Sequence, residues 1–210
     1  MSANSSTGNA RFFASQTHTP NAPAKVSADG LEQRWNETWS QQGTYDFDRN
    51  AERHEVFSID TPPPTVSGSL HVGHVFSYSH TDTVARYQRM RGKAVFYPMG
   101  WDDNGLPTER RVQNFFGVRC DPSLPYVENF EPPHVGGEGK SIKARDQVPV
   151  SRRNFVELCE RLTLADEKQF EDLWRTLGLS VDWSSTYQTI GESARKVAQA
   201  AFLRNLARGE

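Results

Sequence analysis

The sequence predicts an α/β protein whose strands form a parallel sheet. Two short segments, residues 55–60 and 94–97, are rich in apolar and β-branched residues and have the length of strands. Each is followed by a stretch with apolar residues at helical spacing, and these stretches end near Gly92 and Gly117. The order strand, helix, strand, helix is typical of parallel strands joined by right-handed crossovers.

Composition narrows the class of protein. The 210 residues carry 24 Lys and Arg against 26 Asp and Glu, which gives a formal net charge of −2. The apolar share, counted with Gly and without Tyr, is about 40%, below the usual 45–50%, so we expect part of the chain to stay unpacked. No run of 18 apolar residues exists, which excludes a membrane span, and no secretory leader is visible. Cys120 and Cys159 form no CxxC pair, so we expect a cytoplasmic protein in a reducing compartment, without structural zinc.

Residues 1–28 are predicted to be a disordered tail. They contain no acidic residue, only two basic ones (Arg11 and Lys25), and a surplus of Ser, Thr, Asn, Ala and Pro. Such a segment buries too little apolar surface to offset the entropy lost on ordering. An organellar transit peptide is the alternative, but a single Arg in the first 24 residues argues against it.

The segment that follows the tail predicts a helix of about 12 residues. Leu31, Trp35 and Trp39 recur at every fourth position before Gly43, and we expect the two Trp side chains to pack in the core. The strand of residues 55–60 then runs into three prolines, which cannot continue a ladder of hydrogen bonds.

Two loops follow the predicted strands and precede helices. Residues 65–69 lead from the prolines into the helix of residues 70–91, and residues 100–105 form a turn after the strand of residues 94–97. The next helix opens at Pro107, where proline suits the first helical position.

The last 90 residues are expected to be mostly helical. Residues 120–150 hold five prolines and three glycines, which predicts a long loop or an insertion. Two helices are predicted beyond it, at residues 151–164 and 165–177, and a last helix at residues 193–207. No internal repeat is visible.

The first candidate site lies at the start of the helix of residues 70–91. His71 and His74 are three residues apart, so both side chains share one helical face and can point at the same oxyanion. The N-terminus of a helix that follows a parallel strand favours phosphate binding. Gly73 between them leaves room for a flat ring to approach the backbone. A His-x-x-His metal pair without a third ligand and two solvent-facing histidines are the alternatives.

The second candidate site is the turn around Asp102 and Asp103. It follows a strand, so it lies at the same edge of the sheet as the histidines, and a carboxylate there can pair with a substrate ammonium. Asp-Asp-Asn-Gly is also a common sequence for a plain turn.

Together the two sites resemble the class I aminoacyl-tRNA synthetases. The resemblance is carried by Pro62-Pro-Pro-Thr-Val-Ser-Gly-Ser-Leu-His-Val-Gly-His74 and by Gly100-Trp-Asp-Asp-Asn-Gly-Leu-Pro-Thr-Glu-Arg-Arg-Val-Gln113. His71-Val-Gly-His74 corresponds to the signature tetrapeptide of the class, and the triple proline followed by Thr-Val-Ser-Gly-Ser-Leu is similar to its valyl branch. The resemblance runs from about residue 31 to residue 210. Other nucleotidyl transferases with a His-x-Gly-His loop lack the segment after Gly100.

The resemblance implies roles for seven residues. His71 and His74 are expected to contact ATP phosphates and to stabilise charge during amino-acid activation. Gly73 is expected to leave room for adenine, and Gly100 to belong to the ATP site. The substrate α-ammonium is expected between the Pro62 carbonyl, the Asp102 carboxylate and the side chain of Thr65, which stands where many valyl enzymes have Asn.

The resemblance also implies a domain organisation. We expect residues 29–117 to be the first half of a Rossmann-type catalytic domain and residues 118–210 to open a mostly helical connective region, truncated before an editing domain. The implied activity is valine activation with ATP and Mg²⁺ and the charging of tRNA(Val), with the isolated chain inactive. The alternative is an inactive synthetase-like module that binds nucleotide or another protein.

Overall fold

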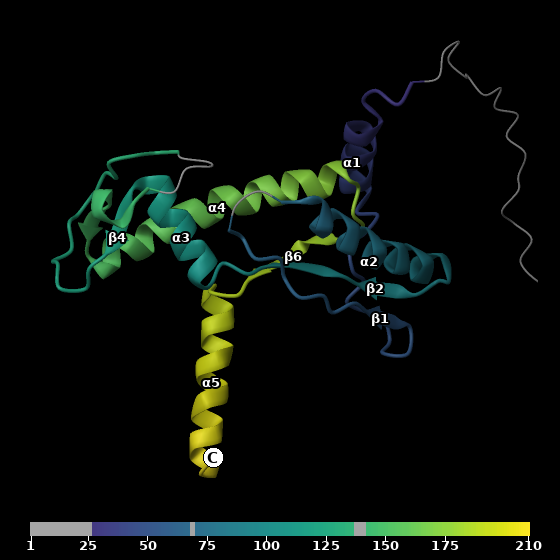
Figure 1. Cartoon of the computed structure of the whole chain (residues 1–210). Coiled ribbons are helices and arrows are strands. Elements are labelled where there is room, and N and C mark those ends of the chain that lie inside the picture. Colours follow the sequence, from purple (N-terminus) through teal and green to yellow (C-terminus); the bar gives the residue numbers. More distant parts are fainter. Residues whose placement is uncertain (1–26, 68–69, 137–141) are drawn as a thin grey trace, which may run out of the picture.

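The computed structural model describes residues 27–67, 70–136 and 142–210, and Figure 1 shows their arrangement. The tail predicted for residues 1–28 lies outside this range except for its last two residues. Within the described part, no helix is long and apolar enough to cross a membrane.

The strands pair in parallel, which confirms the predicted class of sheet. β1 (Val56–Ser58) pairs with β2 (Ala94–Phe96), β3 (Pro98–Trp101) with β6 (Asp182–Gln188), and β4 (Val118–Cys120) with β5 (Val148–Val150). Only Tyr97 separates β2 from β3, so β1 and β6 flank one nearly continuous strand. Beyond β1 a parallel bridge between Thr65 and Asp102 extends the pairing.

The helices account for most of the remaining structure. They are α1 (Leu31–Gln42), α2 (Val72–Met90), α3 (Leu106–Phe116), α4 (Arg152–Thr176) and α5 (Glu192–Arg208), with a 3₁₀ turn at Ala144–Asp146. α1, α2, α3 and α5 lie within two residues of their predicted bounds. Figure 1 shows α5 extending away from the other elements.

The prediction of two helices between residues 151 and 177 is wrong, because α4 runs through as one helix of 25 residues. No Gly or Pro interrupts the segment, and its buried side chains continue along one face from Phe155 to Trp174. α4 thereby joins two apolar clusters. The first half of α4 packs Phe155, Leu158 and Leu162 against Val112, Phe116, Val118 and Val150. The second half packs Phe170 and Trp174 against Tyr97, Met99 and Trp101, in and beside β3.

Four strands were not expected from the sequence. β3 replaces the predicted turn at Gly100 and Trp101, because the apolar side chains of Met99 and Trp101 are buried there. β4 and β5 border the Pro- and Gly-rich segment that we expected to be irregular. β6 has few apolar residues, and it returns from the C-terminal part of the chain to pair with β3.

The tryptophans of α1 are less buried than expected. α1 has no fully buried residue, and the side chain of Trp35 is 45% exposed. Trp39 stacks on Trp35 and contacts Tyr45 and the guanidinium of Arg86 instead of lying in the core. The prediction of core packing for this pair is therefore wrong.

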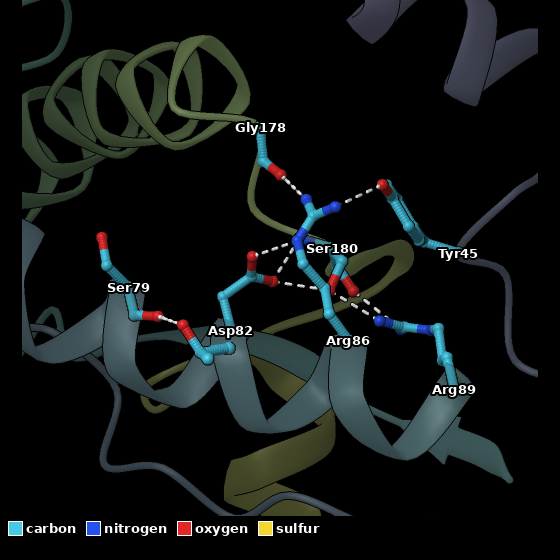
Figure 2. A network of polar contacts seen from close by, with 8 residues as sticks. Tyr45, Ser79, Asp82, Arg86, Arg89, Gly178 and Ser180 are labelled. Atoms are coloured by element: carbon cyan, nitrogen blue, oxygen red, sulfur yellow. Dashed lines mark hydrogen bonds and ion pairs between the residues drawn. The ribbon is translucent and has the colours of Figure 1, made fainter. Parts of the chain in front are cut away.

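A polar network fixes α2 to the segment that leads into β6 (Figure 2). Asp82 accepts hydrogen bonds from the backbone N–H and the hydroxyl of Ser180, at 2.6 and 2.5 Å. Arg86 pairs with the other oxygen of Asp82 at 2.7 Å and donates to the Gly178 carbonyl, while Arg89 donates to the Ser180 hydroxyl and carbonyl. The Asp82 charge is paired and hydrogen-bonded, which offsets the free-energy cost of burying it. These contacts hold α2 against the segment that precedes β6.

Candidate functional site

The N-terminus of α2 is capped by its own histidines. Nδ1 of His71 accepts a hydrogen bond from the Gly73 backbone N–H at 3.1 Å, and Nδ1 of His74 accepts from the His71 backbone N–H at 3.4 Å. The two imidazole rings lie with centroids 4.0 Å apart. Since Nδ1 acts as acceptor in both rings, the neutral tautomer carries its proton on Nε2, and both Nε2–H groups remain as donors to a ligand.

His74 is biased toward the neutral form. Partial burial, followed by the proximity of His71, lowers the pKa of His74 from its usual value of 6.5. At neutral pH the site therefore offers directed N–H dipoles and the positive end of α2, without requiring two imidazolium charges.

Local packing explains why position 73 is a glycine. A Cβ at this position would lie 2.9 Å from Cε1 and 3.0 Å from Nδ1 of His71, so any larger residue would displace the capping imidazole. The contact with adenine that we expect for Gly73 stays a prediction.

Asp102 is held by hydroxyls from the two segments on either side of the end of β3. Thr65 donates to Oδ2 at 3.2 Å, and Thr189, just beyond β6, donates to Oδ1 at 3.4 Å. The Asn104 backbone N–H also approaches Oδ1 at 3.4 Å. Among the residues that the structure describes, none forms an ion pair with Asp102. Its carboxylate is therefore oriented by neutral donors.

The backbone brings Thr65 and Asp102 together. The Val66 N–H donates to the Asp102 carbonyl at 2.8 Å, and the Asp102 N–H donates to the Pro64 carbonyl at 3.0 Å. This pairing places the proline loop beside the turn, as the sequence predicts. Thr189 was not predicted, because its strand was not recognised; a strand ending at residue 188 beside β3 would have indicated it.

The carbonyl of Pro62 has a partner within the protein. The hydroxyl of Tyr78, on α2, donates to it at 2.7 Å. Burial, with a smaller contribution from Tyr187, raises the pKa of Tyr78 to about 12, so the phenol remains a donor at neutral pH. A carbonyl has two lone pairs, and the second one remains for a substrate ammonium.

Gly100 is covered by the ring of Tyr187. A Cβ on Gly100 would lie 2.2 Å from Cζ of that ring, so any larger residue would displace the ring. This packing accounts for Gly100 without ATP, and its place in an ATP site stays a prediction.

No group of three or more His, Cys, Asp and Glu side chains is arranged to hold a metal ion in the described ranges. The metal-pair interpretation of His71 and His74 therefore gains no third ligand from those ranges. Nε2 donors on the α2 N-terminus and an uncompensated carboxylate after β3 are suited to an anionic phosphate and to an ammonium, respectively.

The chain is similar to known proteins. The family model of class I tRNA synthetases (I, L, M and V) matches residues 34–123. The valine–tRNA ligase of Bifidobacterium longum (strain DJO10A) is 69% identical over 188 residues, which cover 90% of this chain and 21% of that protein. The valine–tRNA ligase of Leifsonia xyli subsp. xyli is 68% identical over 192 residues, which cover 90% of this chain and 22% of that protein. The chain thus spans about a fifth of the length of these curated relatives.

A solved structure supports the fold. The agnB2 LeuRS of Agrobacterium radiobacter K84, in a ternary complex with tRNA and LeuAMS, superposes with a TM-score of 0.63 at 24% identity. The match covers 87% of this chain and 18% of that chain.

Proposed function

We propose that the chain, which resembles the class I tRNA synthetases over residues 34–123, provides part of the activation site of a valine–tRNA ligase. In this proposal, residues 29–117 form the first half of a Rossmann-type catalytic domain, and residues 118–210 begin a connective region. The partners are valine, ATP and tRNA(Val), and the place of action is the cytoplasm. The observation that carries the proposal is the Asp102 carboxylate, which is oriented by Thr65 and Thr189 and has no ion-pair partner within the described ranges.

In this proposal, the residues of the site have different roles in adenylate formation. The valine ammonium lies against the Asp102 carboxylate and the free lone pair of the Pro62 carbonyl. This places the valine carboxylate for attack on the α-phosphate of ATP, with pyrophosphate as the leaving group. The Nε2–H groups of His71 and His74 donate to phosphate oxygens, whose negative charge shifts during attack, and the positive end of α2 adds to the stabilisation.

Mg²⁺ accompanies ATP in this proposal, but the described residues offer it no cluster of three protein ligands. We therefore assign the ion to the phosphates of ATP, and no step here depends on a protein-held metal.

The proposal is tested by grafting residues 31–210 into the Bifidobacterium longum ligase in place of the matching segment. We expect the grafted enzyme to exchange pyrophosphate into ATP with valine at a rate within about tenfold of the parent, because the two segments are 69% identical over 188 residues. The isolated chain is expected to show no exchange. A folded graft without valine-dependent exchange, or robust exchange by the isolated chain, would contradict the proposal.

The hydroxyls on Asp102 give a second expectation. In the graft, Thr65→Val and Thr189→Val should each raise the KM for valine about fivefold, the effect of losing one hydrogen bond worth about 1 kcal/mol. The KM for ATP should stay within twofold of the parent. Thr83→Val is the control, because its hydroxyl donates only to the Ser79 carbonyl within α2. Equal effects at Thr83 and Thr189 would show that the change is not specific to Asp102.

A further inference from the structure

The residue after Asp102 carries a second carboxyl, whose environment is different. The side chain of Asp103 is 4% exposed, and neither of its oxygens has a hydrogen-bond donor among the described residues. The group within hydrogen-bonding reach is another carboxyl, that of Glu167 on α4. Glu167 in turn accepts a hydrogen bond from the side-chain amide of Gln188 at 2.6 Å.

Two ionised carboxylates cannot bond to each other, because both are acceptors only. Both would also be poorly solvated and would repel each other, a combination that favours binding of a proton. With one proton between them, the pair forms an O–H···O⁻ hydrogen bond, which is among the stronger ones in proteins. This bond gives one of the two unsatisfied Asp103 oxygens a partner.

The surrounding charges favour the same state. The negative groups that act on the pair are Asp102 in the turn and Glu171 one helical turn along α4. Arg175 pairs with Glu171 at 2.6 Å, and Arg111 pairs with Asp166, the residue before Glu167, at 3.0 Å. Burial, followed by the charge of Asp103, raises the pKa of Glu167 to about 7, and burial raises that of Asp103.

The pair joins three parts of the fold beside the candidate site. Asp103 belongs to the turn after β3, Glu167 to α4, and Gln188 to β6. Gln188, the last residue of β6, is adjacent to Thr189, which donates to Asp102. Two consecutive residues at the end of β6 therefore contact Asp102 and the partner of Asp103. A shift of the turn relative to α4 and β6 would therefore move Asp102 relative to Thr189.

We propose that Asp103 and Glu167 share one proton and act as a positioning pair, which ties the turn of residues 102–105 to α4 and thereby orients Asp102. The shared proton also leaves only one negative charge beside Asp102 instead of two. The positioning role rests on the proposed function, in which Asp102 binds the valine ammonium, but the sharing of the proton does not.

The shared proton is tested on the 210-residue chain itself. A carboxyl whose pKa is raised by folding makes the folded chain hold more protons than the unfolded one. The free energy of unfolding should therefore fall as pH rises from about 4.3, the ordinary pKa of Glu, to about 7. Urea unfolding at half-unit steps of pH measures this fall. Glu167→Gln should remove most of it, because the amide donates to Asp103 without a titrating proton.

The control is Glu160→Gln, at an exposed position on the same helix. It should keep the pH dependence of the unmodified chain. If the chain and its Glu167→Gln variant have parallel profiles between pH 4.5 and 7.5, no proton is shared and the proposal is overturned.

The positioning role is tested in the grafted enzyme. Glu167→Ala leaves the Asp103 carboxyl without a partner, so we expect the KM for valine to rise about 10-fold, more at pH 8 than at pH 6.5, with the KM for ATP unchanged. Glu167→Gln should stay within about twofold of the graft. Equal loss in both variants, or equal effects on valine and ATP, would overturn the positioning role. An inactive graft that carries neither variant would instead overturn the proposed function, and the unfolding profiles would still decide whether the proton is shared.

Discussion

Replacing His74 by alanine in the grafted ligase is expected to lower the rate of valine activation about 10²-fold or more. The lost group is a preoriented Nε2–H donor at the N-terminus of α2, and removal of one such donor from a site of developing negative charge has effects of this size. The rate is measured as valine-dependent ATP–pyrophosphate exchange at saturating substrate. Because the pKa of His74 lies below 6.5, the loss should be the same at pH 7 and pH 8.5.

The matched control is His80→Ala. His80 lies on the same helix, is exposed, and contacts the edge of Phe76. Its loss should leave the exchange rate within twofold of the graft. A rate for His74→Ala that equals the rate for His80→Ala would return His74 to the class of solvent-facing histidines.

The helices were predictable because their ends depend on local chemistry. Gly43, Gly92, Gly117 and Gly178 all have positive φ, between 59° and 83°, in the structure. An L-residue with a side chain rarely adopts this conformation, so a glycine after an apolar repeat is a local signal for the end of a helix. This signal is visible in the local sequence, without knowledge of any distant contact.

The strands and the contacts of the site depended on distant parts of the chain. β6 contains Asp, Ser, Thr and Gln, and it becomes a strand because β3 pairs with it and Asp182 is hydrogen-bonded to Ser184 and Ser185. Thr189 lies 87 residues from Asp102 along the chain, and Glu167 lies 64 residues from Asp103. Periodicity within one segment carries no information about such pairings.

The same lack of long-range information explains why the sequence does not distinguish Asp102 from Asp103. The sequence indicates a carboxylate in a turn after a strand, but it does not indicate that one of the two adjacent carboxyls is buried against α4. The burial of Asp103 follows from the packing of a helix that begins about 50 residues later. Because Asp103 is buried, replacing it would also disturb the packing of the turn, so Asp103 is not a suitable control for Asp102.

Replacing Asp102 by alanine should raise the KM for valine far more than the KM for ATP. The lost carboxylate faces the α-ammonium in the proposed site, and its charge-assisted hydrogen bond is worth about 2 to 3 kcal/mol, or roughly 30- to 150-fold in kcat/KM. Asp102→Asn keeps the shape of the side chain and an acceptor for Thr65 or Thr189 but removes the charge. It should therefore lose nearly as much as Asp102→Ala.

The control for this charge is Glu109→Ala, which removes a carboxylate from the exposed surface of α3, seven residues further on. Because its carboxylate is solvated, we expect kcat/KM for valine to change less than twofold. The ratio of the effects on valine and on ATP separates binding of the ammonium from a general electrostatic effect on the phosphates. An effect of Asp102→Ala that is larger on ATP than on valine would place the carboxylate at the nucleotide, because a lost negative charge near the phosphates acts on ATP first.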